Sequence, residues 1–130
     1  MKAVLFVCVE NSNRSQMAEA FARIHASDRL TVYSAGSKPS GKVNPKAIQA
    51  MQQRGYDLTI HHSKAFSDLP DMPFDFIITM GCGDTCGHIP AATREDWALP
   101  DPREMPPAEF NQVRDEIETR VIDLLARLDT

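Results

Sequence analysis

The sequence has little of what marks nucleic-acid-binding, membrane-spanning or disulfide-stapled proteins. Among its 130 residues, 18 Asp and Glu outnumber 14 Lys and Arg, which gives a formal net charge of -4. A chain without a basic surplus does not hold nucleic acid or an anionic membrane by overall electrostatics, so we expect neither as a partner. No hydrophobic run approaches the length of a transmembrane helix, and we expect a cytoplasmic protein.

Cysteine is also scarce. The sequence contains Cys8, Cys82 and Cys86, an odd number in a chain with no recognisable secretory signal. A static disulfide framework is therefore not expected, which leaves redox chemistry and metal binding open. Repeats, linkers and low-complexity tracts are absent too, and we expect a single domain over residues 1–130 with one core.

The sequence does contain alternating strand and helix signals. Continuous apolar runs predict strands buried on both faces, and an LTVYS segment predicts a further strand. The expected strands are Lys2–Cys8, Leu30–Ser34 and Phe74–Met80, with a short additional one at Asp96–Leu99.

Helices are predicted between these strands from apolar residues at helical spacing. The first begins at Ser15 and ends near Ser27, with Met17, Phe21 and Ile24 on its apolar face. The second begins with Asn44 as N-cap and Pro45 in the first turn. A strong terminal helix carries apolar residues from Phe110 to Leu128, and one helical turn is expected around Ala65–Leu69.

Strands that alternate with helices indicate an α/β fold. We expect a three-layer single domain, in which a central parallel sheet of about four strands has helices on both faces. Ligands of such sheets bind beyond the carboxyl ends of the strands, where the strand order reverses. Cys8 ends the first strand and Cys82 follows the third, so these two thiols are expected at one crevice.

Residues 8–15 read Cys-Val-Glu-Asn-Ser-Asn-Arg-Ser and lie between the first strand and a helix start. Backbone N–H groups of such a loop form an anion nest, and Arg14 adds a planar fork that matches two oxygens of a tetrahedral oxyanion. A helix N-terminus and a nearby arginine also stabilise a thiolate, so Cys8 is predicted to be a nucleophile. The predicted oxyanion-binding residues are Val9, Glu10, Asn11, Ser12, Asn13, Arg14 and Ser15.

Side chains of this loop have further expected roles. Asn11, Ser12 and Ser15 are expected to hold the loop and the thiolate by local hydrogen bonds. Glu10 is expected to face solvent, because an inward carboxylate repels the anion. The alternative for Cys8 is a small buried hydrophobe at a strand end. The combination of nest, helix start and arginine favours the nucleophile.

The loop resembles the low-molecular-weight tyrosine phosphatase superfamily, whose mark is Cys-x5-Arg-Ser after the first strand. The continuation Gln16-Met17-Ala18-Glu19 is more similar to the arsenate reductases of that superfamily, because the phosphatases usually place Pro after Arg-Ser. This resemblance implies a phosphatase-like fold and an enzyme that reduces arsenate. We expect a monomer without a tightly bound cofactor. It extends over Tyr33-Ser34-Ala35-Gly36, Val43-Asn44-Pro45-Lys46-Ala47, Cys82, Cys86, Trp97, Asp101-Pro102 and Phe110 with Val113-Arg114-Asp115.

Cys82 and Cys86 are four residues apart among glycines. On a regular helix their Cβ atoms would lie about 6 Å apart, so a disulfide between them needs local unwinding, which glycine favours. The resemblance implies a relay in which Cys8 attacks arsenate and Cys82 attacks the Cys8 sulfur, releasing arsenite. Cys86 then forms a disulfide with Cys82, and thioredoxin reduces it by thiol exchange, with glutaredoxin or a small thiol as alternative donors.

Other interpretations of these cysteines stay open. The Cys-x3-Cys spacing suits zinc ligands that His88, His61 or His62 would complete, although we expect no metal because a second cysteine pair is lacking. The matching function is a non-catalytic protein that binds zinc or arsenite through thiols. Among enzymes, the alternative is a low-molecular-weight protein tyrosine phosphatase, which needs neither Cys82 nor Cys86.

By the same resemblance, Asp101 is the general acid that protonates the leaving oxygen. The alternative is a turn-forming Asp before Pro102. Arg103, Glu104 and Met105 follow where the tyrosine phosphatases commonly carry an aromatic residue. This departure favours a small inorganic anion over a phosphotyrosine.

Some arsenate reductases of this family hold a potassium ion near the loop, at positions that match Asn11, Glu19 and Ser34. At the position where a further acidic ligand is expected, this chain carries Lys64. We predict that the Lys64 ammonium pairs with Glu19 and takes the place of the cation. Asn13 is a second departure, since many relatives carry Cys at that position.

Overall fold

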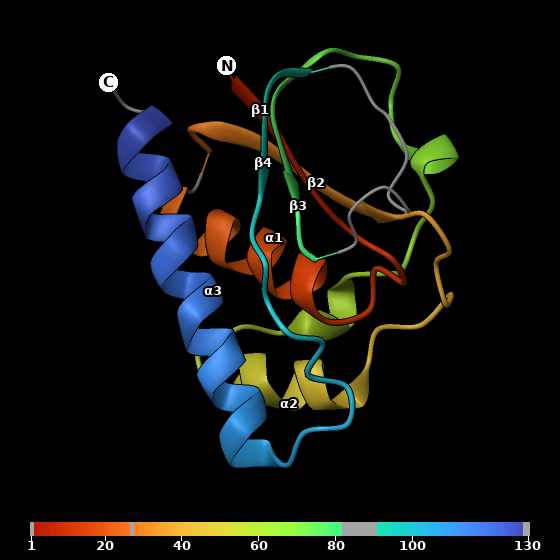
Figure 1. The fold of residues 1–130 in the computed structure, drawn as a ribbon, viewed down its shortest axis with the longest axis vertical. Helices are drawn as coiled ribbons and strands as arrows, with labels where there is room; N and C mark the ends of the chain where they lie inside the picture. The colour runs from red at the N-terminus through yellow and green to blue at the C-terminus, as the bar shows by residue number, and fades with distance from the viewer. Residues whose placement is uncertain (1, 27, 82–90, 129–130) are drawn as a thin grey trace.

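A computed structural model describes residues 2–26, 28–81 and 91–128, and Figure 1 shows their arrangement. Four strands of the described chain form one parallel sheet in the order β2-β1-β3-β4. The prediction of an α/β fold with a parallel sheet of about four strands is confirmed. The strands are β1 (Lys2–Cys8), β2 (Leu30–Gly36), β3 (Phe74–Thr79) and β4 (Ala91–Asp96).

The register of the sheet aligns the carboxyl ends of its strands. Cys8 pairs with Gly36 of β2, Val7 pairs with Thr79 of β3, and Thr79 pairs with Asp96 of β4. The chain adds β2 on one side of β1 and then β3 on the other, so the order reverses at β1. Ligand crevices of open α/β sheets lie at such a point, beyond the strand ends. Cys8 therefore ends the central strand at the expected place.

Three α-helices in the described part of the chain pack on one face of the sheet, as Figure 1 shows. Among the described residues, the opposite face is covered by the 3-10 turn η2 and the chain after it, through Phe66, Leu69 and Met72. That covering is thinner than the helices expected on this face. The helical elements are α1 (Arg14–Ala26), α2 (Pro45–Gln52), α3 (Pro107–Leu128) and the 3-10 turns η1 (Leu58–Ile60) and η2 (Phe66–Asp68).

Strand β1 is buried on both faces, as its continuous apolar run predicts. Every residue from Ala3 to Cys8 is at most 3% exposed. Val4 and Phe6 pack in the cluster that holds the α-helices, whereas Leu5 and Val7 pack in the cluster on the opposite face. Full burial of one such large side chain stabilises the fold by about 1.5–3 kcal/mol. Cys8 thus ends the most firmly packed strand of the sheet.

The helices lie close to where the sequence predicts them, and one residue of a predicted apolar face is the exception. Helix α1 begins at Arg14, directly after the loop, and α2 begins with the Asn44 side chain accepting a hydrogen bond from the Lys46 N–H at 2.9 Å. Ile24 was predicted on the apolar face of α1, but it is 41% exposed. Ala26 is buried in the last turn of α1 instead.

The predicted strand at Asp96–Leu99 is wrong. The edge strand is Ala91–Asp96, whose side chains are mostly exposed, and it forms because its backbone pairs with β3. The apolar signal at Trp97 and Leu99 reflects burial in the core outside the sheet, where the Trp97 ring lies 5.9 Å from that of Phe6. Strand β2 also runs two residues further than expected, through Gly36.

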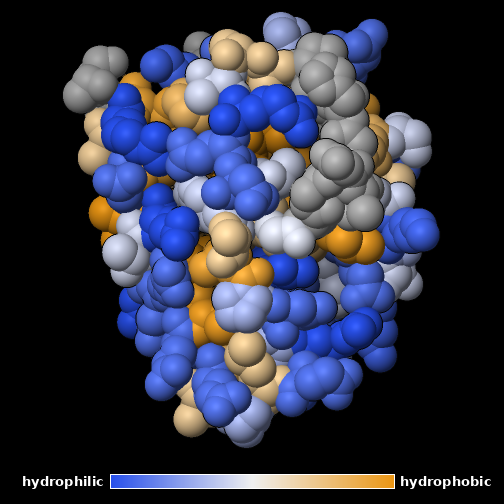
Figure 2. Space-filling model, in the orientation of Figure 1, coloured by the Kyte–Doolittle hydropathy of each residue, from blue (hydrophilic) through white to orange (hydrophobic). Residues whose placement is uncertain are grey.

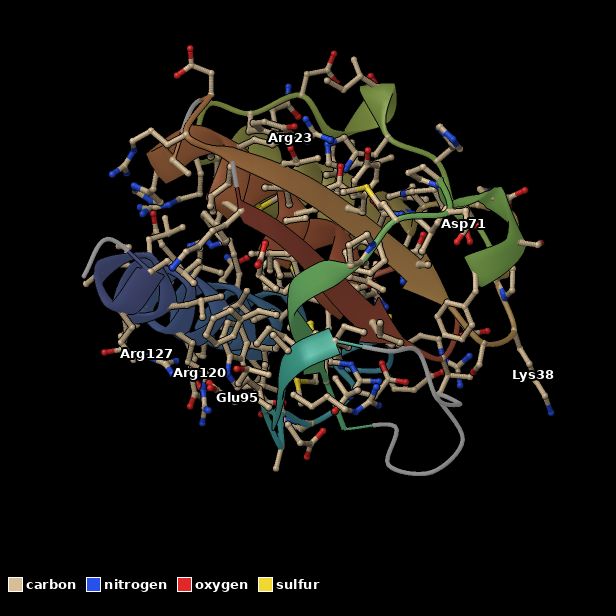
Figure 3. The ribbon with its side chains drawn as sticks, turned by 90° about the horizontal axis from the view of Figure 1, so that it is seen from above. Arg23, Lys38, Asp71, Glu95, Arg120 and Arg127 are labelled. Atoms are coloured by element: carbon tan, nitrogen blue, oxygen red, sulfur yellow. The ribbon has the colours of Figure 1, made fainter. Side chains whose placement is uncertain are left out.

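Charged groups join the edge strand to the terminal helix. Figure 3 shows Glu95 of β4 close to Arg120 and Arg127 of α3. Two N–H groups of Arg127 donate to the two Glu95 carboxylate oxygens, each at 2.9 Å. These bonds hold the pKa of Glu95 below its usual range.

Figure 2 shows a mostly hydrophilic face with a narrow hydrophobic strip beside α3. None of the helices in the described ranges is both long and apolar enough to cross a bilayer.

Candidate active site

A cavity of about 370 Å³ opens at the carboxyl end of β1. Its walls come from the loop between β1 and α1 and from the two segments that follow β2 and β4. Of the predicted site residues, the cavity is lined by Cys8, Val9, Glu10, Ser12, Asn13, Arg14 and Asp101. Asn11 and Ser15 are fully buried in the same loop.

The Cys8 sulfur is held by a short hydrogen-bonded chain. It lies 2.8 Å from the Ser15 hydroxyl oxygen, which accepts a hydrogen bond from the Asn11 side-chain nitrogen at 2.8 Å. Because the Ser15 oxygen accepts from Asn11, its own hydrogen is available for the sulfur. A hydroxyl donor aimed at sulfur stabilises a thiolate, the nucleophilic form of cysteine. The predicted local hydrogen bonds of Asn11 and Ser15 are confirmed.

The loop backbone has one conformation that needs a special residue. Asn11 has φ of 51°, in the left-handed region, where Asn is favoured among residues other than Gly. Gly36 lies against the loop, and a Cβ at that position would be 2.5 Å from the Val9 carbonyl oxygen. The end of β2 therefore has to be glycine for the loop to close over it.

Arg14 is fixed at the cavity wall from a distant part of the chain. The side chain is buried, and one guanidinium nitrogen donates to the Leu99 carbonyl oxygen at 2.9 Å. Gly81, at the exit of β3, passes so close that a Cβ there would lie 2.8 Å from that guanidinium. These contacts orient the arginine fork beside Cys8.

Asn13 lines the cavity with a buried side-chain amide that has an unsatisfied hydrogen-bond acceptor. Its side-chain oxygen has no hydrogen-bond partner within the described part of the chain. A buried polar atom left without a partner at a cavity is one that a ligand or water can satisfy.

Glu10 and Asp101 bring two carboxylates to the cavity. Glu10 is 40% exposed, as expected, and its carboxylate lies 3.0 Å from an Arg103 guanidinium nitrogen. Asp101 is exposed and accepts a hydrogen bond from the Arg103 backbone N–H at 3.1 Å. That bond has the i to i+2 form of an Asx turn, so the turn role of Asp101 and its place at the cavity coexist.

Sequence reasoning missed two cationic residues of the cavity wall, Lys38 and Arg103. Figure 3 shows Lys38 extending outward near the end of β2, and its backbone N–H donates to the Val9 carbonyl oxygen at 2.8 Å. The only available signal was position: Arg103 follows Asp101 closely, and Lys38 follows the predicted second strand.

A buried charge cluster lies beneath the loop. Glu19 accepts a hydrogen bond from the Ser34 hydroxyl at 2.6 Å and pairs with Arg23 at 3.0 Å and Lys64 at 3.6 Å. Burial alone would raise the pKa of Glu19, but Lys64, the Ser34 hydroxyl and further cationic neighbours together hold it below its ordinary value of 4.5. The predicted pairing of Lys64 with Glu19 is confirmed.

The same cluster does not suit a potassium ion. The Lys64 ammonium lies 3.2 Å from the Ser34 hydroxyl oxygen, and the Lys64 backbone N–H donates to the Asn11 side-chain oxygen at 3.0 Å. Two of the oxygens that would bind a cation thus already face Lys64, and a second positive charge among them would be repelled.

Gln16 connects the loop to a buried histidine. Its side-chain nitrogen donates to the Asn11 side-chain oxygen at 2.8 Å, and its side-chain oxygen lies 2.9 Å from His61 Nδ1. The Tyr56 hydroxyl lies 2.6 Å from His61 Nε2. A neutral His61 that donates from Nδ1 and accepts from Tyr56 satisfies both contacts. Burial lowers the pKa of His61 below 6.5, which favours that neutral form.

Cys82 and Cys86 lie outside the described residues, as does His88. The structure therefore places neither the predicted relay thiols nor the zinc alternative that uses them. Within the described ranges, no group of three or more His, Cys, Asp or Glu side chains is arranged to hold a metal ion.

The fold and the loop define an α/β protein with a Cys-x5-Arg-Ser anion loop at the carboxyl edge of a parallel sheet. Residues 3–130 match the family of low molecular weight phosphotyrosine protein phosphatases. The chain belongs to this family, and it is an enzyme of the phosphatase superfamily.

Relatives within the family carry a more specific name. The chain is 38% identical to an arsenate reductase of Staphylococcus aureus over 130 residues, with 97% of this chain and 98% of that protein covered. A solved structure of an arsenate reductase in the phosphate binding state superposes with a TM-score of 0.86 at 35% identity, covering 98% of both chains. The thioredoxin-dependent arsenate reductase of Corynebacterium glutamicum superposes with a TM-score of 0.80 at 32% identity, covering 99% of this chain and 62% of that one.

Proposed function

We propose that this protein reduces arsenate to arsenite, with Cys8 as the nucleophile. The observation that carries the proposal is the Cys8 sulfur at the floor of an anion cavity, 2.8 Å from the Ser15 hydroxyl and beside the fixed guanidinium of Arg14. Relatives that match nearly the whole chain are arsenate reductases, which supports arsenate as the oxyanion.

In the first step, the Cys8 sulfur attacks the arsenic atom of arsenate. One arsenate oxygen is protonated and leaves as water, so a thiol-arsenate adduct forms without a change in the oxidation state of arsenic. Asp101 is the proposed general acid, because its carboxyl group borders the same cavity. Arg14 and the N–H groups of the loop neutralise the oxyanion. The other proposed oxyanion-binding residues are Val9, Glu10, Asn11, Ser12, Asn13 and Ser15.

In the second step, the Cys82 thiolate attacks the Cys8 sulfur. The sulfur–arsenic bond breaks, its electron pair stays on arsenic, and arsenite leaves as As(III) while a Cys8–Cys82 disulfide forms. Cys86 then attacks Cys82, frees the Cys8 thiolate and leaves a Cys82–Cys86 disulfide. A thioredoxin-type dithiol returns the two electrons by thiol exchange. Phosphate suits the same loop but undergoes no such two-electron reduction.

The proposed enzyme is a single-domain cytoplasmic monomer with no resident metal or cofactor. Its electrons come from the thiol donor. The tyrosine phosphatase alternative is less well supported, because none of the described residues that line the cavity is aromatic. An aryl phosphate would find no ring on which to stack.

The test is NADPH oxidation in the presence of arsenate, thioredoxin and thioredoxin reductase. We expect turnover by the wild type and none by the Cys8→Ser, Cys82→Ser and Cys86→Ser variants, with Ser67→Ala on the exposed side of η2 as an active control. An Asp101→Asn variant should retain the fold and lose most of the rate.

Two results would overturn the proposal. Hydrolysis of p-nitrophenyl phosphate that needs Cys8 alone, without arsenate turnover, would identify a phosphatase. Stoichiometric zinc in the purified protein, again without turnover, would identify a metal-binding thiol protein.

A further inference from the structure

An ion pair lies at the wall of the Cys8 cavity. The Glu10 carboxylate and the Arg103 guanidinium are 3.0 Å apart, and both side chains line the cavity. They are 40% and 53% exposed, so both side chains that line the cavity also reach bulk solvent. It joins the anion loop to the segment that carries Asp101.

The Arg103 side of the pair is held by its backbone. Its N–H donates to the Asp101 carboxylate at 3.1 Å, and its carbonyl oxygen accepts from the Lys46 ammonium of α2 at 2.8 Å. Lys46 also donates to the Met105 carbonyl oxygen at 3.3 Å. The position of Arg103 is therefore tied to that of Asp101.

The backbone of Glu10 is also held by two hydrogen bonds. Its carbonyl oxygen accepts from the Ser63 hydroxyl at 2.9 Å and from the Ser40 N–H at 3.1 Å. Because both backbones are held in place, the Glu10–Arg103 bridge joins two anchored segments that line the cavity.

The position of the bridge matters for the choice of ligand. In a phosphate monoester, the substituent is attached to the oxygen that leaves opposite the attacking sulfur. The group that protonates this oxygen lies beside it, so the substituent of a bound ester has to pass Asp101 and its neighbour Arg103. A free oxyanion has no substituent and fits beneath the bridge.

We propose that the Glu10–Arg103 ion pair is a specificity determinant that admits free inorganic oxyanions to the Cys8 cavity and rejects their aryl and alkyl esters. The inference rests on the proposed function, since it concerns the same anion site. It adds Arg103 to the site and gives the Glu10 side chain, whose backbone belongs to the anion loop, a separate role at the entrance.

The test compares the binding of inorganic phosphate and phenyl phosphate to the full chain by calorimetry, in a Cys8→Ser background that prevents hydrolysis. Loss of Arg103 weakens and loss of Glu10 strengthens the binding of any dianion, so the ratio of the two affinities is the measured quantity. We expect this ratio, phosphate over phenyl phosphate, to fall at least tenfold in both Glu10→Ala and Arg103→Ala.

Glu104→Ala is the matched control, because Glu104 is 92% exposed, lies 3.8 Å from Arg103 and does not line the cavity. Its affinity ratio should stay within threefold of the background. Exposed ion pairs contribute little to stability, so all three variants should fold, which circular dichroism checks.

An unchanged ratio in both Glu10→Ala and Arg103→Ala would overturn the inference, as would an equal change in Glu104→Ala. This measurement involves no reduction. A failed arsenate assay with an altered ratio would refute the proposed function alone, and an unchanged ratio with active arsenate turnover would refute the entrance filter alone.

Discussion

The Ser15 hydroxyl lies 2.8 Å from the Cys8 sulfur and accepts a hydrogen bond from Asn11 at the same distance. Ser15 is the second residue of α1, and Cys8 is the last residue of β1. The helix start therefore supplies a side-chain donor to the nucleophile in addition to its backbone dipole. One hydroxyl connects the loop conformation to the reactive sulfur.

Removal of this hydroxyl should slow Cys8 without unfolding the protein. Hydrogen bonds to charged groups contribute about 1.5–3 kcal/mol, so Ser15→Ala is expected to lower the rate of Cys8 alkylation or turnover by roughly ten- to a hundredfold. Iodoacetamide kinetics measure this directly. The same substitution at exposed Ser67 should leave the rate unchanged; an equal slowing there would refute the role of Ser15.

Lys64 should make the protein indifferent to potassium. Because its ammonium already pairs with buried Glu19, the melting temperature is expected to be equal in potassium and tetramethylammonium chloride. In Lys64→Asp, the site has a new carboxylate beside Glu19, and potassium should raise the melting temperature. Lys42→Asp in an exposed loop is the control. A potassium-dependent rise in the wild type would contradict the prediction.

Removal of the Lys64 ammonium without a replacement charge should lower the free energy of unfolding. Lys64→Met leaves the buried Glu19 carboxylate with Arg23 at 3.0 Å and with His61, uncharged at neutral pH, at 3.7 Å. Breaking a buried pair from one side costs about 3–5 kcal/mol, and the partial exposure of Lys64 reduces this to about 2–3 kcal/mol. Urea unfolding at neutral pH gives the difference, and a loss below 0.5 kcal/mol, on the order of an ordinary surface substitution, would refute it.

Acidification should destabilise the fold in two stages. Burial lowers the pKa of His61 below 6.5, so the unfolded chain binds a proton first, and stability falls as the pH drops from 6.5 through the folded-state pKa. The lowered pKa of Glu19 adds a further loss of stability, which begins as the pH falls below 4.5. His61→Gln should flatten the first stage in urea unfolding from pH 7.5 downward, whereas His62→Gln should not. Identical curves for the wild type and His61→Gln would refute the assignment.

A methyl group at Gly36 should disturb the anion loop. Its Cβ would lie 2.5 Å from the Val9 carbonyl oxygen and 2.9 Å from the Asn11 nitrogen. Gly36→Ala is expected to cost about 1–3 kcal/mol and to weaken phosphate binding at least tenfold. Gly41 has φ of 81° and no atom within 4 Å of its Cβ position. Gly41→Ala should therefore cost stability through its backbone alone and leave phosphate affinity unchanged.

The anion loop was predictable because it is local. Its cysteine, arginine and serines occur within eight consecutive residues between a continuous apolar run and a helix start. Strand β1 and helix α3 were predictable for the same reason, since their apolar patterns are strong and regular.

The edge strand and the entrance were not predictable, because their causes lie elsewhere in the chain. Ala91–Asp96 has weak strand propensity and forms by pairing with β3, a contact that no local pattern records. Arg103 and Glu10 are 93 residues apart, and their pairing depends on how Lys46 and Asp101 fix the backbone of Arg103. The contact of His61 with Gln16 likewise joins residues that no motif associates.

The hydrogen bond from Arg14 to the Leu99 carbonyl oxygen spans 85 residues and ties the anion loop to the segment that follows the edge strand β4. During synthesis, β1 leaves the ribosome before its neighbour β3, which begins at Phe74. Cys8 is therefore made long before Leu99, whose carbonyl oxygen holds Arg14 in place. The arginine contribution to the reactivity of this thiol is thus acquired only after the chain beyond β4 has been made.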